Sequence, residues 1–214
     1  ILSLHVRHTA PSTTTLLREE LRDGVTFVRT NRALIGLALL GFSTTFLGSP
    51  ILTFLPLFAQ DVLHGGVGQY TQLMTFAGAG AVAGALRVAW RGASPRMGQA
   101  TLVMQFCYGV CVAAFALTRA FWLNGVLIFG AGVCMVTVSA SLSSLVQLNA
   151  PNALRGRVMS IYMVAFRGGM PLGSFVAGWL ATATSAPTVL LVNGLLLTAV
   201  ATVFLTRTRG VREL

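Results

Sequence analysis

The chain has 214 residues, of which 55% are hydrophobic and only 9% are charged. An ordinary soluble domain carries roughly 25% charged residues, so this composition excludes a disordered chain and argues against a water-soluble globule. The mean hydropathy of +0.78 indicates that a lipid bilayer is the solvent.

The net charge of +10 arises from 15 basic and 5 acidic residues, and every basic residue is an arginine. The arginines stand in short clusters between long apolar runs, whereas a nucleic-acid surface needs them on one face among polar and aromatic residues. We therefore expect no nucleic-acid partner. The cysteines inside the apolar runs lack metal-ligand spacing, so we expect neither a metal nor a cofactor; they are Cys107, Cys111 and Cys134.

Residues 1–32 are predicted to form a cytoplasmic segment with an amphipathic helix. Its apolar residues share one side of a helical wheel, with arginines on the flank; they are Leu17, Leu21, Gly24, Val25 and Val28. Such a helix lies at the membrane interface, or else it is a solvated linker helix without lipid contact. Because Ile1 stands in place of an initiator Met, we expect the chain to be cut from a longer protein.

Five long uncharged windows follow, and a membrane-spanning helix needs about 20 mainly apolar residues. The last window, with residues 158–167 before it, is long enough for two helices separated by the polar stretch 182–187. The sequence thus predicts an all-α membrane protein with a six-helix bundle over residues 33–206. The predicted helices cover about 33–60, 69–90, 98–118, 121–149, 157–181 and 187–206.

The positions of the arginines predict the orientation of this bundle, because short arginine-rich loops stay on the cytoplasmic side. Clusters occur in the leader, in the loops after the second and fourth helices, and in the basic tail 207–214. Both ends of the chain are therefore predicted to be cytoplasmic. The loop arginines assigned to topology or to a cytoplasmic gate are Arg87, Arg91, Arg96, Arg155 and Arg157.

Small residues recur along the second and fifth predicted helices, where they allow close approach of helix backbones. The glycines assigned to packing are Gly80, Gly84, Gly169, Gly173 and Gly178. The motif of residues 82–86, near the end of the second helix, recurs at residues 176–180 in the fifth. This recurrence favours a 3+3 inverted repeat, an architecture that transporters use.

Two stretches carry a resemblance to a known family. Residues 152–160 (NALRGRVMS) and 165–174 (AFRGGMPLGS) resemble the loop before helix eleven, and that helix, in the major facilitator superfamily. Leader residues 17–24 (LREELRDG) and 27–29 (FVR) are similar to the central cytoplasmic loop of its bacterial branch of enterobactin exporters and macrolide efflux proteins. The resemblance implies the C-terminal six-helix half of a twelve-helix transporter.

The resemblance also implies function and partners. We expect secondary active export of a drug-like compound or siderophore by alternating access, in the bacterial inner membrane. The implied partners are the bilayer, the N-terminal six-helix half of the same transporter and a small-molecule substrate. Anionic compounds are among the candidate substrates. One departure is that the gate motif after the second helix keeps Gly84 and its arginines but lacks the family's acidic residue, which argues against a charge-relay role.

By this resemblance the first and fourth helices of the half line a central substrate cavity. The candidate cavity residues are Ser49, Thr53, Thr137, Ser141, Ser144 and Arg167. Each hydroxyl could instead bond its own helix or a neighbour. Arg167 either faces the cavity and attracts anionic groups, or is an anchor for carbonyls freed near Pro171 or a partner for an acid of the other half. Gln105 and Tyr108 are expected at the periphery.

Other function classes are less consistent with the sequence. An intramembrane enzyme needs a nucleophile within reach of a base, and all three histidines lie outside the predicted spans, so we expect no enzyme. A channel would show a filter sequence or a ring-forming acid. A structural membrane partner, or the six-helix subunit of an ATP-driven permease, remains the alternative that hydropathy does not exclude.

Overall fold

The computed structural model describes residues 25–92 and 96–207, and in these two ranges every regular element is a helix. Residues 25–30 are helical, and Asn31 begins the next helix by accepting hydrogen bonds on its side-chain oxygen from the N–H groups of Ala33 and Leu34, at 3.0 and 3.3 Å. The predicted interfacial leader up to residue 24 and the tail from residue 208 lie outside the described residues.

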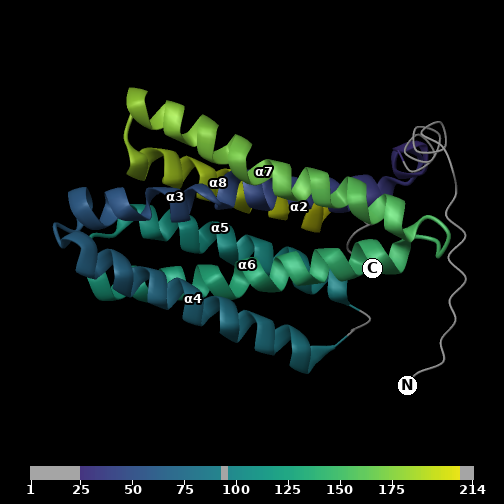
Figure 1. Cartoon of the computed structure of the whole chain (residues 1–214), viewed down its shortest axis with the longest axis horizontal. Helices are drawn as coiled ribbons and strands as arrows, with labels where there is room; N and C mark the ends of the chain where they lie inside the picture. Colours follow the sequence, from purple (N-terminus) through teal and green to yellow (C-terminus); the bar gives the residue numbers. More distant parts are fainter. Residues whose placement is uncertain (1–24, 93–95, 208–214) are drawn as a thin grey trace, which may run out of the picture.

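The elements follow one another with short connections (Figure 1). In chain order they are α2 (Arg32–Gly48), α3 (Pro50–Leu57), the π-helical turn η1 (Phe58–Val62), α4 (Gly66–Arg91), α5 (Met97–Leu117), α6 (Phe121–Asn149), α7 (Arg155–Ala183) and α8 (Ala186–Arg207).

The first predicted helix is interrupted where its prolines lie. Pro50 and Pro56 cannot donate to the carbonyls four residues earlier, and the chain passes from α2 through Ser49 into α3 and then into the π-turn. The turn to α4 follows at His64 and Gly66, both with positive φ, of 55° and 63°. The boundary between α2 and α3 therefore falls at Pro50, whereas Pro56 lies inside α3 one residue before its end.

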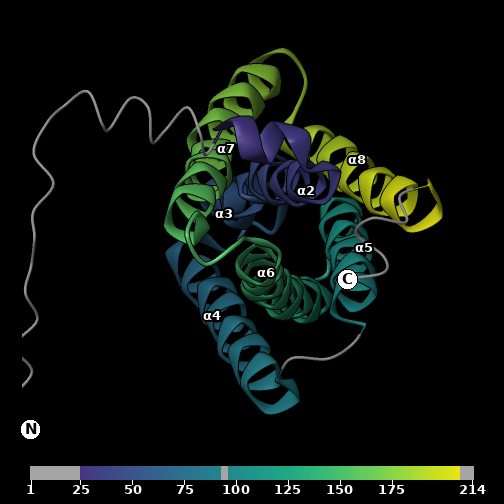
Figure 2. The same ribbon diagram turned by 90° about the vertical axis from the view of Figure 1, so that its right-hand side faces the viewer.

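The helices pack in pairs that are distant in sequence. The closest pairs are α4 with α6, α5 with α8, and α2 with α7, while α5 also packs on α6 and α2 on α8. Viewed from the end, α2 and α6 lie in the middle, with α4 and α7 on one side and α5 and α8 on the other (Figure 2).

Within the described residues, five helical stretches are long and apolar enough to cross a membrane: Arg32–Val62, α4, α5, α6 and α8. The prediction of an all-α membrane protein is confirmed at this level. α7 has 29 residues but is not among the five, because Arg167, Pro171 and several glycines lower its hydropathy.

Glycines allow three of these helix pairs to approach closely. A Cβ at Gly80 would overlap the carbonyl of Phe129 on α6, and one at Gly173 would overlap that of Phe46 on α2. Gly84 and Gly169 make the same kind of approach to Val133 and Phe42, and Gly109 lies against Gly194 between α5 and α8. Gly178 does not share such a contact, since nothing lies within 4 Å of where its Cβ would stand.

Candidate functional site

A ladder of hydroxyl contacts joins α2 and α3 to α7. Thr45 Oγ1 donates to the carbonyl of Phe166 at 2.7 Å, Ser49 Oγ donates to that of Met170 at 3.4 Å, and Thr53 Oγ1 lies 3.0 Å from Ser174 Oγ. Both helices advance by four residues between rungs, so the two run in the same direction with a constant register.

Two predicted cavity residues are thus part of this ladder. Ser49 is buried, with 1% of its surface exposed, whereas the Thr53 pair is exposed. The contacts are the cross-helix bonds that a hydroxyl in a membrane helix forms with a neighbour. Ser49 is also the residue between α2 and α3, and it precedes Pro50, which has no N–H to donate to the helix.

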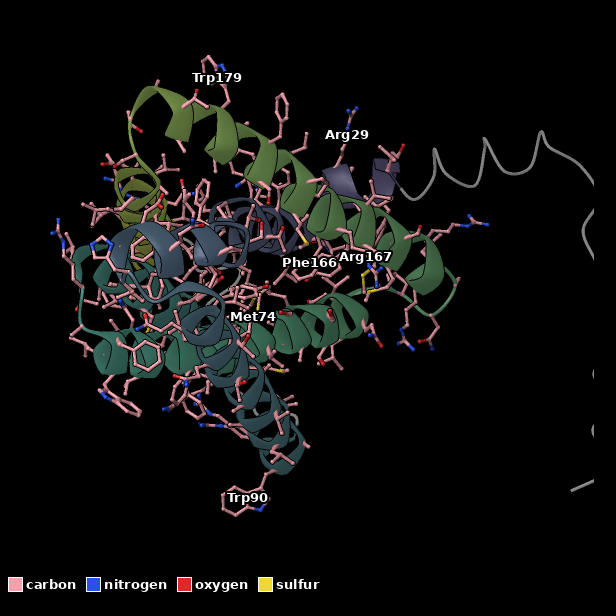
Figure 3. All side chains as sticks on the ribbon, turned by 60° about the vertical axis from the view of Figure 1, so that its left-hand side comes forward. Arg29, Met74, Trp90, Phe166, Arg167 and Trp179 are labelled. Atoms are coloured by element: carbon pink, nitrogen blue, oxygen red, sulfur yellow. The ribbon has the colours of Figure 1, made fainter. Side chains whose placement is uncertain are left out.

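Arg167 lies on α7 between two rungs of the ladder. Its side chain is exposed and makes no hydrogen bond to any other described residue. Figure 3 shows Arg167 beside Phe166 on α7, whereas Trp90 and Trp179 point outward at opposite edges. The guanidinium is therefore free to meet a group that comes from outside these helices.

The other predicted hydroxyls lie together on α6, opposite arginines of α4. Thr137 and Ser141 line a pocket of about 40 Å³ with Arg87 and Arg91, closed on the α5 side by Met97, Ala100 and Met104. Next to it, Ser144 lines a more open pocket of about 470 Å³ with Gln147 and Gly92. The structure therefore groups these hydroxyls with the gate arginines and places Ser49 and Thr53 in a different contact.

The other three arginines assigned to topology or gating, Arg96, Arg155 and Arg157, do not line this pocket. Arg96 immediately precedes α5, whose first residue, Met97, lines the pocket beside Arg87. Arg155 Nε donates to the carbonyl of Gln147 at 3.2 Å, and its Nη2 donates to Asn152 Oδ1 at 2.7 Å, which ties the start of α7 to the end of α6. Arg157 is half-buried in the first turn of α7.

A third pocket, of about 260 Å³, lies between α3, α4, α5 and α6. Its lining is apolar except for Tyr108 and comprises Ile51, Leu52, Met74, Ala77, Gly78, Ala81, Tyr108, Ile128, Ala131, Gly132, Met135 and Val136. The Tyr108 side chain is 1% exposed, and its hydroxyl has no hydrogen-bond partner in the described structure. Its ring lies against Gly48, where a Cβ would overlap it.

The expectation that Gln105 and Tyr108 lie at the periphery is wrong, since both side chains are buried inside the bundle. Gln105 Nε2 donates to Ser43 Oγ at 3.3 Å, and its Oε1 has no partner. A usable signal was present in the sequence: a glutamine in an otherwise apolar membrane helix is costly toward lipid and turns toward protein. Tyr108 lies one turn further along the same face of α5.

Over residues 25–92 and 96–207, no group of three or more His, Cys, Asp or Glu side chains could hold a metal ion. No curated protein and no solved structure matches the chain.

A family model does match, and it extends over residues 3–212. The family is described as transmembrane secretion effectors within the major facilitator group. The match includes the hydroxyl ladder, the three pockets and the five apolar stretches. The chain is therefore a multi-pass membrane protein that belongs to the transmembrane secretion effector family of major facilitator transporters.

Proposed function

We propose that this chain is the C-terminal half of a secondary active transporter that exports a drug-like compound or a siderophore by alternating access. The family match over residues 3–212 carries this proposal. Alternating access moves one half of a transporter against the other around a site at their interface. The partner is then an N-terminal six-helix half of the same transporter, and the membrane is a bacterial inner membrane.

The packing of the helices supports a six-helix half with a 3+3 repeat. α7 is 29 residues long, about 43 Å at 1.5 Å per residue, which is long enough to span a bilayer although its hydropathy is low. α2 pairs with α7 as α6 pairs with α4, and α2 meets α8 as α6 meets α5. Exchanging the first three helices with the last three therefore maps the closest helix pairs onto one another.

The distribution of charge supports cytoplasmic ends. The arginines near the junctions α4–α5 and α6–α7 and at the end of α8 gather at one end of the bundle, whereas Asp61 lies at the other end beside the start of α4 (Figure 1). Positive charge on short loops favours the cytoplasmic side. Under this proposal the α3, η1 and α4 junction faces the outside.

The substrate cavity is proposed on the face formed by α3, α4, α6 and α7. The apolar pocket of about 260 Å³ beside Met74 would take the hydrocarbon part of a substrate, as pockets for small molecules are mainly apolar. Arg167 would meet an anionic group of the substrate, such as a catecholate or carboxylate. Ser49 and Thr53 would hold the wall of α3 against α7.

The test is transport by the full-length protein in proteoliposomes, with an imposed proton gradient. We expect saturable movement of a macrolide or a catechol siderophore by the full-length protein and none by residues 1–214 alone, because one half lacks the opposing wall. Saturable transport by this chain alone contradicts the half-transporter proposal. ATP-dependent transport with a separate ATPase subunit favours the permease alternative.

A further inference from the structure

Arg87 is a half-buried arginine without a counter-charge in the described structure. Its Nη1 donates to the thioether sulfur of Met104 at 2.7 Å. Asp61 is the only acidic residue among residues 25–92 and 96–207, and it lies near the start of α4, about 30 Å from Arg87 along that helix. An unpaired charge that is partly removed from water is costly, so the position favours binding of an anion.

The pocket around Arg87 offers several hydrogen-bond donors. Arg91 follows one turn later on the same side of α4, and like charges at this spacing repel each other. Ser141, 8% exposed, lines the same pocket and makes no hydrogen bond to another described residue. Two guanidinium groups and a free hydroxyl around one space fit an oxyanion, and arginine binds phosphate oxygens in a bidentate manner.

The surroundings of the pocket indicate where the oxyanion comes from. A shallow, wide-open apolar surface lies on the outer side of α4 beside Arg87 and is formed by Ala83, Leu86, Ala89 and Trp90 of this one helix. The Trp90 side chain is 96% exposed and points away from the bundle (Figure 3). Exposed tryptophan at a helix end marks the headgroup level of a bilayer. This apolar face of α4 therefore leads toward the arginines at the end of the helix, which Trp90 places at the level of the lipid phosphates.

We infer that the end of α4 binds the phosphate of an anionic phospholipid, with Arg87 and Arg91 on the phosphate oxygens and Ser141 as a further donor. One acyl chain lies against the exposed apolar face of α4 beside Leu86 and Ala83. Basic pockets between membrane helices bind phospholipid headgroups by this chemistry. The inference depends only on the placement of the chain in a membrane, and it concerns lipid rather than the transported substrate.

The binding test uses the full-length protein, delipidated in detergent and titrated with phosphatidylglycerol, phosphatidylcholine or inorganic phosphate while bound molecules are counted by native mass spectrometry. We expect phosphatidylglycerol to bind more tightly than the other two. Arg87→Gln and Arg91→Gln should each weaken its binding about fivefold, as an arginine near a lipid surface contributes on the order of 1 kcal/mol. Arg119→Gln removes the same charge from the α5–α6 loop and should have no effect.

Several results would overturn the inference. Equal affinity for inorganic phosphate would assign the pocket to a free anion, and equal affinity for phosphatidylcholine would remove the role of net charge. The same would follow if Arg87→Gln and Arg119→Gln behaved alike, or if an acidic residue from another part of the protein filled the pocket and no lipid bound. If Arg87→Gln does not fold, Arg91→Gln and Ser141→Ala decide the question.

A second measurement locates the lipid. Phosphatidylglycerol brominated on its acyl chains should quench tryptophan fluorescence, and the saturable part of that quenching should disappear in Trp90→Phe but remain in Trp179→Phe. Persistence of this part in Trp90→Phe would place the lipid elsewhere. Neither measurement requires transport, so loss of lipid binding and loss of transport activity are recorded separately.

Discussion

The Thr45 hydroxyl donates a hydrogen bond to the backbone carbonyl of Phe166 at 2.7 Å, although the two residues are 121 positions apart. The next two rungs keep the same separation of 121. Because this separation is constant, α7 runs parallel to α2 and α3 in a fixed register. The glycines Gly169 and Gly173 lie beside these rungs and bring the backbones close enough for side chain to meet carbonyl.

The first prediction concerns Gly173. In Gly173→Ala the new methyl would overlap the backbone of Phe46, which cannot rotate away, so we expect the free energy of unfolding to fall by about 1–3 kcal/mol, as for other overpacked cores. Gly178→Ala is the matched control, because nothing lies within 4 Å of its Cβ position. Thermal unfolding in detergent measures both, and similar melting temperatures would show that α7 does not pack closely on α2.

Thr45 itself can be tested with a nearly isosteric change. Thr45→Val removes the hydroxyl and keeps the branched shape, and we expect a loss of about 0.6 kcal/mol, typical of side-chain hydrogen bonds in membrane proteins. Thr202 on α8 bonds only its own helix, at the carbonyl of Thr198, so Thr202→Val should change stability less. The same unfolding assay applies, and a larger loss at Thr202 would contradict a special role for the α2–α7 bond.

The third prediction concerns Tyr108, whose replacement is expected not to lower the stability of the protein. Because its buried hydroxyl has no partner in the described structure, Tyr108→Phe should leave stability unchanged or raise it, since an unsatisfied buried polar group costs about 1–3 kcal/mol. Gly48→Ala, which would overlap the ring of Tyr108, should destabilise the protein. A lower melting temperature for Tyr108→Phe would reveal an acceptor for this hydroxyl outside the described helices.

Arg167 distinguishes two roles in transport. If it faces the cavity, Arg167→Gln in the full-length transporter should weaken efflux of anionic substrates and leave neutral substrates nearly unaffected, with normal expression. Its exposed side chain, without a hydrogen bond to the described residues, favours this outcome. Efflux rates over a range of substrate concentrations provide the measurement. An equal loss for neutral and anionic substrates, or loss of folded protein, would assign Arg167 to the scaffold.

The last prediction concerns energy coupling. Asp61, the only acidic residue in the described part of the chain, is exposed in the turn after α3 and lies outside the middle of the membrane where a proton relay needs a carboxylate. Asp61→Asn should therefore leave proton-driven transport by the full-length protein intact. The essential carboxylate is then expected in the N-terminal half. Proton-driven transport that survives neutralisation of every acidic residue in that half would reject this expectation.

The sequence by itself determined that the chain lies in a lipid bilayer, that its regular elements are helices and where its charges stand along the chain. An uncharged run of about 20 residues in a bilayer must satisfy its backbone hydrogen bonds internally, and a helix is the structure that does so within one segment. The family resemblance also came from sequence, through residues 152–160 and 165–174, and the family match confirms it at the level of a major facilitator transporter.

Only the tertiary structure decided which polar residues meet. The periodicity of a helix tells which residues share a face, but the neighbour of that face depends on how all the helices pack. The sequence therefore predicts one cavity for Ser49 and Ser141, yet Ser49 bonds α7 while Ser141 faces Arg87. For the same reason the sequence places Tyr108 and Gln105 at the periphery. Their helix α5 lies at the side of the bundle, but close packing on α8 and α6 turns these two side chains inward.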